Sequence, residues 1–151
     1  MLHLGFTGTR YGMTPAQSVA VERLTRRLAE AHYVVAHHGD CVGADAEFHE
    51  IARLYVDRIV IHPPVDEMRR AFCRPADEWR DARSHLARNQ AIVIESMIMI
   101  AAPFECEHRR GGTWYTIAHV RKLERPLALV LRNGGDRCAT VEFSGNAGWP
   151  R

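Results

Sequence analysis

The chain contains 151 residues with a formal net charge of +2, and 25% of the residues are charged. This length suffices for one domain with a single hydrophobic core, and the balance of apolar and charged residues excludes a globally disordered chain. The small net charge does not by itself indicate a nucleic-acid partner or a membrane surface.

Cysteine usage and the first residues indicate the compartment. The four cysteines, at positions 41, 73, 106 and 138, form no C-x-x-C pair, so we expect reduced thiols. Residues 1–5 lack the basic and apolar regions of a signal peptide, and no apolar run reaches the ~20 residues of a membrane-spanning helix. We therefore predict a soluble, cytoplasmic protein without a membrane partner.

The first predicted strand and helix follow one another closely. Residues 2–6 form an apolar strand, and Thr14 and Pro15 then suit the N-cap and the first position of a helix. The helix carries one apolar stripe, which we expect to face the core. This stripe consists of Val19, Val21, Leu24 and Leu28.

Strand-like and helix-like segments alternate along the rest of the chain. The further predicted strands cover residues 33–36, 58–61, 97–101 and 126–131, with a possible edge strand at 139–143. The further predicted helices cover residues 44–55, 77–94 and 113–123. Residues 62–75 are expected to be irregular and to cross the top of the sheet, and residues 133–136 to form a turn.

This alternation predicts an α/β fold. Strands separated by helices form βαβ units and hence a mainly parallel sheet, here of five or more strands, covered by helices on both faces. We expect a Rossmann-like three-layer α/β/α domain over residues 1–151, in which the tail from about 133 supplies the edge strand. Ligands bind such sheets at the carboxyl ends of the strands, so the loops that follow the strands are the candidate sites.

The loop after the first strand contains Gly8, Thr9 and Arg10. Gly8 lets the backbone turn tightly, the Thr9 hydroxyl can donate a hydrogen bond, and the Arg10 guanidinium matches the geometry of a phosphate. The segment is neither a G-x-G-x-x-G fingerprint nor a Walker A loop with its lysine. An ordinary strand-to-helix turn remains the alternative.

The loop after the second strand brings two glycines and two carboxylates to the start of a helix. Gly43 and Ala44 would let a ligand approach the amides and the positive dipole of the helix N-terminus. Asp40 could accept a hydrogen bond from a ribose hydroxyl or act as a base. The candidate binding residues of this loop are Gly39, Asp40, Gly43, Ala44 and Asp45. Asp45 has the alternative role of a charge that stabilises the first helical turn.

Neighbouring histidines precede this loop. His37 and His38 lie on one strand, where successive side chains point to opposite faces of the sheet. A metal ion needs further ligands, and the sequence does not place them. We therefore predict no metal site and no required cofactor.

The loop after the fourth strand is long and polar and ends at a helix. Gly111, Gly112 and Thr113 would offer backbone amides and a hydroxyl to an anion, Arg110 adds a positive charge, and Trp114 could stack on a ring. A capped helix with an aromatic core contact is the alternative. On the preceding helix, Arg88 and Asn89 form a weaker candidate pair, and Glu107 is a possible acid or base.

Taken together, these segments resemble the SLOG superfamily, in particular its small phage and bacterial group related to YspA and YpsA. The matching pieces are residues 5–10, 37–45, 87–89, 100–103 and 110–114. They occur in order over most of the chain, and the second and last are the most specific. The resemblance implies a Rossmann-like fold, a nucleotide-type ligand above the sheet, and a homo-oligomer.

The wider superfamily also implies residue roles. Its "lonely guy" phosphoribohydrolases cleave an N-glycosidic bond with an arginine, which Arg88 resembles, and a glutamate that follows a glycine–threonine motif. Here the glutamate position falls at about Tyr115 or Thr116, neither of which carries a carboxylate. Asp40 or Glu107 could substitute, so the predicted catalytic set is Asp40, Arg88 and Glu107.

Three functions follow from these observations. The first is a binding or sensing domain for a nucleoside monophosphate, an ADP-ribose-like molecule or a cofactor nucleotide. The second is an N-glycosidic-bond hydrolase or transferase on nucleoside monophosphates, and the third is a carrier of the molybdenum cofactor. The near-neutral charge, without a basic-aromatic run, argues against a nucleic-acid partner.

Overall fold

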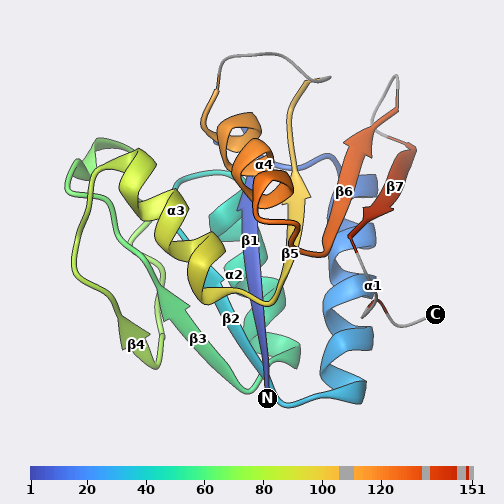
Figure 1. The fold of residues 1–151 in the computed structure, drawn as a ribbon, viewed down its shortest axis with the longest axis horizontal. Coiled ribbons are helices and arrows are strands. Elements are labelled where there is room, and N and C mark those ends of the chain that lie inside the picture. Colours follow the sequence, from blue (N-terminus) through green and yellow to red (C-terminus); the bar gives the residue numbers. More distant parts are fainter. Residues whose placement is uncertain (106–110, 134–136, 146–148, 150–151) are drawn as a thin grey trace.

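A computed structural model describes residues 1–105, 111–133, 137–145 and 149, and these form one seven-stranded sheet flanked by helices (Figure 1). The strand order is β4-β3-β2-β1-β5-β6-β7, and only β7 runs antiparallel to its neighbour. The strands are β1 (Leu2–Gly8), β2 (Val34–His38), β3 (Arg58–Ile61), β4 (Glu78–Trp79), β5 (Ile98–Ala102), β6 (Leu127–Arg132) and β7 (Ala139–Ser144). The helices are α1 (Pro15–Ala31), α2 (Ala44–Tyr55), the short η1 (Glu67–Arg69), α3 (His85–Glu95) and α4 (Gly112–Lys122).

The helices cover both faces of the sheet. α1 and α2 pack on one face, where the fully buried rings of Phe6 and Phe48 stack with centroids 4.3 Å apart. α3 and α4 lie over the other face (Figure 1), where Ile117 of α4 and Met99 of β5 belong to one buried hydrophobic cluster. The predicted Rossmann-like three-layer α/β/α class is confirmed.

Side chains of α1 define its start and join it to the sheet. Thr14 is the N-cap, as the Thr–Pro pair predicted, and the structure adds a capping box between Thr14 and Gln17. The buried Gln17 amide also donates to the carbonyls of Pro103, 3.0 Å away, and Val130, 2.9 Å away. One side chain thus fixes α1 to the carboxyl ends of β5 and β6.

The predicted helix over residues 77–94 was wrong in its first half. Glu78 and Trp79 instead add β4 to the sheet beside β3, and the Asp77 carboxylate accepts a hydrogen bond from the Ile59 amide. α3 begins only at His85, because the Ser84 side chain caps it. Tertiary pairing with β3 therefore overrides the local helical preference of this segment.

Smaller differences concern single residues and strand ends. Val19 was expected in the apolar stripe of α1, but it is 65% exposed, because the buried face of the helix runs through Gln17, Ala20, Val21, Leu24, Thr25 and Leu28. β1 and β2 both extend two residues beyond their predicted ends. Within the described residues, no helix is long and apolar enough to cross a membrane.

Candidate functional site

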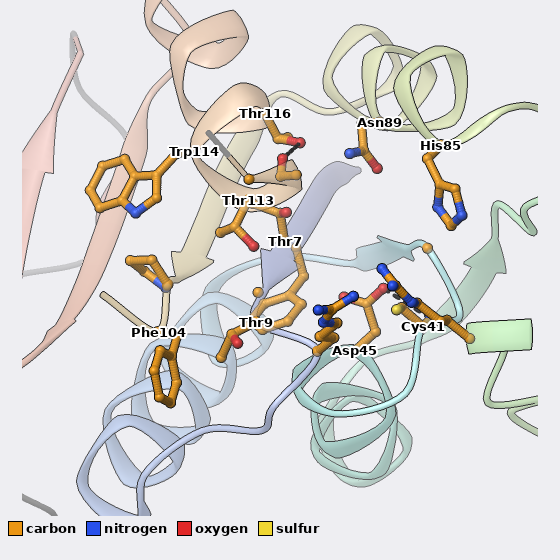
Figure 2. A pocket seen from close by; sticks show the side chains of 18 of the residues that line it. Thr7, Thr9, Cys41, Asp45, His85, Asn89, Phe104, Thr113, Trp114 and Thr116 are labelled. Carbon is orange, nitrogen blue, oxygen red and sulfur yellow. Dashed lines mark hydrogen bonds between the residues drawn. The ribbon is translucent and has the colours of Figure 1, made fainter. Parts of the chain in front are cut away.

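A cavity of about 640 Å³ lies at the carboxyl ends of β1, β2 and β5. Figure 2 shows Thr7, Thr9 and Asp45 on one side of it and Thr113 and Trp114 on another. The predicted site residues that line it are Gly8, Thr9, Arg10, Gly39, Asp45, Arg88, Asn89, Gly111, Gly112, Thr113 and Trp114. Three predicted loops therefore meet around one hollow.

The loop after β1 forms part of the cavity wall and is tied to α2. The Thr9 carbonyl accepts hydrogen bonds from the amides of Gly12 and Ala44, and the Thr9 hydroxyl accepts one from the Tyr11 amide. The exposed Arg10 donates to the Tyr11 hydroxyl, 2.7 Å away. Gly43 adopts a φ of +89°, and a Cβ there would lie 2.3 Å from the Arg10 carbonyl oxygen. Gly43 and Ala44 therefore shape this junction, and neither belongs to the cavity lining.

The predicted catalytic residue Asp40 is held away from the cavity. Its side chain is fully buried, and its carboxylate accepts hydrogen bonds from the Arg70 guanidinium at 2.7 Å and the Cys73 amide at 2.8 Å. It does not belong to the cavity lining. Asp40 therefore links the loop after β2 to the segment after η1 through these hydrogen bonds.

Asp45 is the buried carboxyl group of the cavity wall. It is 6% exposed, and its carboxylate accepts a hydrogen bond from the Cys41 amide at 3.1 Å. Burial raises the pKa of Asp45 to about 6, although the positive charge of Arg88 opposes this rise. The group is therefore close to its titration point near neutral pH, as a general acid or base must be.

Arg88 is the buried cation of the cavity wall. It lies on α3, is 6% exposed, and donates to the Gly39 carbonyl and, at 3.4 Å, to the His62 carbonyl. Its other hydrogen-bond partners are Asn89 and His85. A Cβ at position 39 would lie 2.5 Å from the guanidinium, so any larger residue there would displace the Arg88 side chain. Among the described residues, no carboxylate oxygen lies within 4.0 Å of this guanidinium.

The N-terminus of α4 opens toward the same cavity. Its N-cap is Gly111, with a φ of +121°, and no side chain of the described residues caps the helix there, in contrast to Thr14 and Ser84 at α1 and α3. Gly111, Gly112 and Thr113 line the cavity. The first amides of a helix have no partner within the helix, so they are available to an anion at this position.

The aromatic residues of this region differ in their placement. Trp114 of α4 is buried in the hydrophobic cluster on this face of the sheet, and its indole nitrogen donates to the Glu105 carbonyl at 3.2 Å, so the core-contact alternative describes it better than stacking on a ligand. Tyr115 bonds to Gln90 instead of lining the cavity. The predicted residues Glu107 and Arg110 lie outside the described residues.

Sequence reasoning missed several cavity residues. Tyr11 and Phe104 form an exposed aromatic pair with ring centroids 5.2 Å apart, and Arg69 and His85 add basic groups. Arg69 belongs to the segment that was predicted to cross the top of the sheet. That prediction could have indicated that Arg69 lies near the cavity. Cys41 also lines the cavity, and burial raises the pKa of its thiol, so it is not a thiolate at neutral pH.

The fold and the cavity define a class: a Rossmann-like α/β/α protein with a hollow at the carboxyl edge of its parallel strands. Solved structures of the same fold include the molybdenum cofactor binding protein of Rippkaea orientalis, with 19% identity, a TM-score of 0.67, and coverage of 87% of this chain and 77% of that one. The molybdenum cofactor carrier protein of Chlamydomonas reinhardtii shares 17% identity with a TM-score of 0.61, covering 85% and 75%.

DNA processing protein A from Helicobacter pylori, described with a single-stranded DNA binding mode, shares 19% identity with a TM-score of 0.62, covering 91% of this chain and 68% of that one. The likeness to these structures confirms the fold that the SLOG resemblance implied. The narrower YspA and YpsA group stays a prediction. No protein-family model and no curated protein matches the sequence.

Proposed function

We propose that this protein binds a phosphorylated small molecule, a nucleotide or a nucleotide-derived cofactor, in the cavity above β1, β2 and β5. The observation that carries the proposal is Arg88, a buried guanidinium in the cavity wall whose described partners are two main-chain carbonyls, an amide and an imidazole. A buried charge is costly unless an opposite charge compensates it, so an anionic ligand would supply what these partners lack.

The surroundings of Arg88 support an anion at this place. The uncapped N-terminus of α4 contributes its amides and its dipole, and Arg10 and Arg69 stand on the cavity wall. The volume of about 640 Å³ is in the usual range for small-molecule sites. We assign the phosphate to the space between Arg88 and Gly112, where the guanidinium and the helix amides both act on it.

An aromatic pair supports a ring at the other end of the ligand. Tyr11 and Phe104 are 67% and 40% exposed, and both line the cavity. Exposed rings at a cavity wall offer a face on which a base or a pterin can stack. The ligand would then extend from Arg88 to this pair.

The first experiment measures thermal unfolding with a panel of nucleoside monophosphates and ADP-ribose. At a concentration of about one hundred times Kd, a ligand adds about 2.7 kcal/mol of stability, or roughly 5–10 °C in Tm for a chain of this size. Arg88→Met should abolish this shift, and Thr113→Val, which leaves the Arg88 contacts intact, should reduce it. Arg53→Met, on the exposed face of α2, is the matched control. Unchanged ligand shifts in folded Arg88→Met protein would overturn the assignment.

A second candidate function is hydrolysis of an N-glycosidic bond, and Asp45 is the observation that favours it. Its carboxyl group lines the cavity, and its pKa of about 6 suits proton transfer to a departing base. Chromatography of nucleoside monophosphates after incubation separates the two candidates. Release of free base that Asp45→Asn abolishes, with binding retained, supports the enzyme; intact nucleotide supports a binding or sensing domain.

The neighbours suggest two further ligands. Two of them are named for binding or carrying the molybdenum cofactor, whose phosphorylated pterin is compatible with Arg88 and the aromatic pair. One is described with single-stranded DNA. Fluorescence anisotropy of a labelled oligothymidylate tests whether this protein binds single-stranded DNA. Oligothymidylate binding that nucleoside monophosphates do not displace would favour a nucleic-acid ligand over a small-molecule ligand.

A further inference from the structure

A second group of polar side chains lies on the α3 face of the sheet. His37 of β2 and His62, which follows β3, approach each other with Nδ1 and Nε2 3.0 Å apart, and both side chains are buried. The Glu95 carboxylate, at the end of α3, lies 3.8 Å from the same His37 nitrogen. The three ligand atoms all lie within 4.8 Å of one another.

We propose that His37, His62 and Glu95 form a binding site for a divalent transition-metal ion, with Zn²⁺ the best match to the donors. Two imidazoles and one carboxylate are a common zinc set, in which a fourth position stays open to water. A tetrahedral ion with bonds of about 2.0–2.1 Å needs ligand atoms about 3.3 Å apart. The separations of 3.0 and 3.8 Å lie on either side of this value, and all three ligand atoms lie within 4.8 Å of one another.

Neighbouring groups hold the donors in place, as metal sites require. The Nδ1 of His3 lies 2.8 Å from the Nε2 of His37, so this contact orients the ring and occupies the nitrogen that would not bind the ion. Arg80 donates to both oxygens of Glu95, at distances of 2.9 to 3.1 Å. Arg80 therefore orients the carboxylate and also competes with an ion for it.

A small cavity adjoins two of the three donors. It has a volume of about 80 Å³ and is lined by His62, Glu95, Ala91, Asp81 and three arginines, Arg80, Arg83 and Arg88. His37 does not belong to this lining, and the three guanidinium charges oppose the binding of a cation.

This site differs from the pair formed by the neighbouring His38. That side chain points to the opposite face, where it meets His49 and the ring of Phe48, and among the described residues no third donor joins the two histidines. The expected opposite orientation of His37 and His38 is thus observed. The further ligands of the His37 site are His62, directly after β3, and Glu95 of α3, which only the fold brings together.

The test uses the tag-free full chain after dialysis against a chelator, titrated with Co²⁺ as a spectroscopic probe and then with Zn²⁺. We expect one ion per chain, visible d–d absorption of a four- or five-coordinate ion, and displacement by Zn²⁺. His62→Ala and Glu95→Gln should each weaken metal binding by at least about tenfold. Loss of a group that only hydrogen-bonds to a metal ligand already lowers metal affinity by about tenfold or more.

His32→Ala removes an exposed imidazole at the end of α1 and is the matched control. Circular dichroism checks that each variant folds, and the fully buried His37 is left unaltered because its loss could disturb the core. Absence of saturable Co²⁺ binding in the parent chain, or equal binding by folded His62→Ala and Glu95→Gln, would overturn the site. Nucleotide-induced shifts in Tm are measured in the same variants, and their persistence would separate this site from the cavity of Arg88.

Discussion

Replacing Asp45 by Asn should stabilise the fold at neutral pH, because burial of this carboxylate costs free energy. The pKa of Asp45 is raised from 3.8 to about 6, so the folded state binds its proton more tightly than the unfolded state. Each pKa unit is equivalent to about 1.4 kcal/mol, so ionised Asp45 costs about 3 kcal/mol above pH 6. Asn keeps the shape of the side chain and removes that charge.

The sign and the pH window follow from linkage. Between pH 3.8 and about 6, the folded state holds more protons at Asp45 than the unfolded chain, so the contribution of this group to stability falls as pH rises. The advantage of Asp45→Asn should therefore be about 1 kcal/mol near pH 4.5 and reach at most about 3 kcal/mol near pH 7.5. Lost attraction to Arg88 and the weaker acceptor for the Cys41 amide reduce the gain.

Urea unfolding of both proteins, followed by circular dichroism at several pH values, measures this difference directly. Subtracting the free energies of unfolding of the two proteins at each pH removes the contributions of all titrating groups that the substitution does not affect. Asp57→Asn is the matched control: this carboxylate accepts a hydrogen bond from the Val34 amide away from the cavity. If the difference between Asp45→Asn and the parent does not grow from pH 4.5 to 7.5, the burial of an ionisable carboxyl group at this position is refuted.

Three further predictions concern the cavity and its supports. Binding of ADP-ribose, whose diphosphate diester keeps its charge in this range, should tighten as pH falls through about 6, because Asp45 becomes neutral, and calorimetry should show this trend vanish in Asp45→Asn. Gly39→Ala should weaken the same binding, because the added Cβ would lie 2.5 Å from the Arg88 guanidinium; equal affinity in the variant would contradict that packing. Gln17→Ala should lose about 1–3 kcal/mol in urea unfolding, because the carbonyls of Pro103 and Val130 lose their buried donor, and a loss within error would refute the clamp.

The sequence predicted the parallel strands and most helices because their signals are local. An apolar run such as residues 58–61 and a cap such as Thr14 before Pro15 are contained within a few residues. The start of α3 was missed because Glu78 and Trp79 gain partners on β3, which is about twenty positions earlier in the chain. Pairing at that distance overrides helical periodicity, and no local pattern reports it.

In the candidate site, too, the features with local sequence signals were predicted and those that depend on long-range contacts were not. Glycine-rich loops that follow strands are visible in the sequence, and Gly39, Asp45, Arg88 and Gly112 do meet around one cavity. The role of Asp40 could not be predicted, because it depends on Arg70 and the Cys73 amide, which arrive from an irregular segment. Such long-range contacts decide that Asp45 faces the cavity and Asp40 does not.

The position of the cavity has a topological cause. The chain builds the sheet outward from β1 through β2 to β3 and β4, then returns to place β5 on the other side of β1. At this reversal, the loops after β1 and β5 lead to helices on opposite faces, α1 and α4, and so they diverge and leave a crevice between them. Thr9 and Arg10 from the loop after β1 line this crevice together with Phe104 and Gly112 from the loop after β5. Ligand binding at this edge is therefore favoured by the strand order, whereas the preference for an anion depends on Arg88 and the uncapped α4 and can be altered by single substitutions.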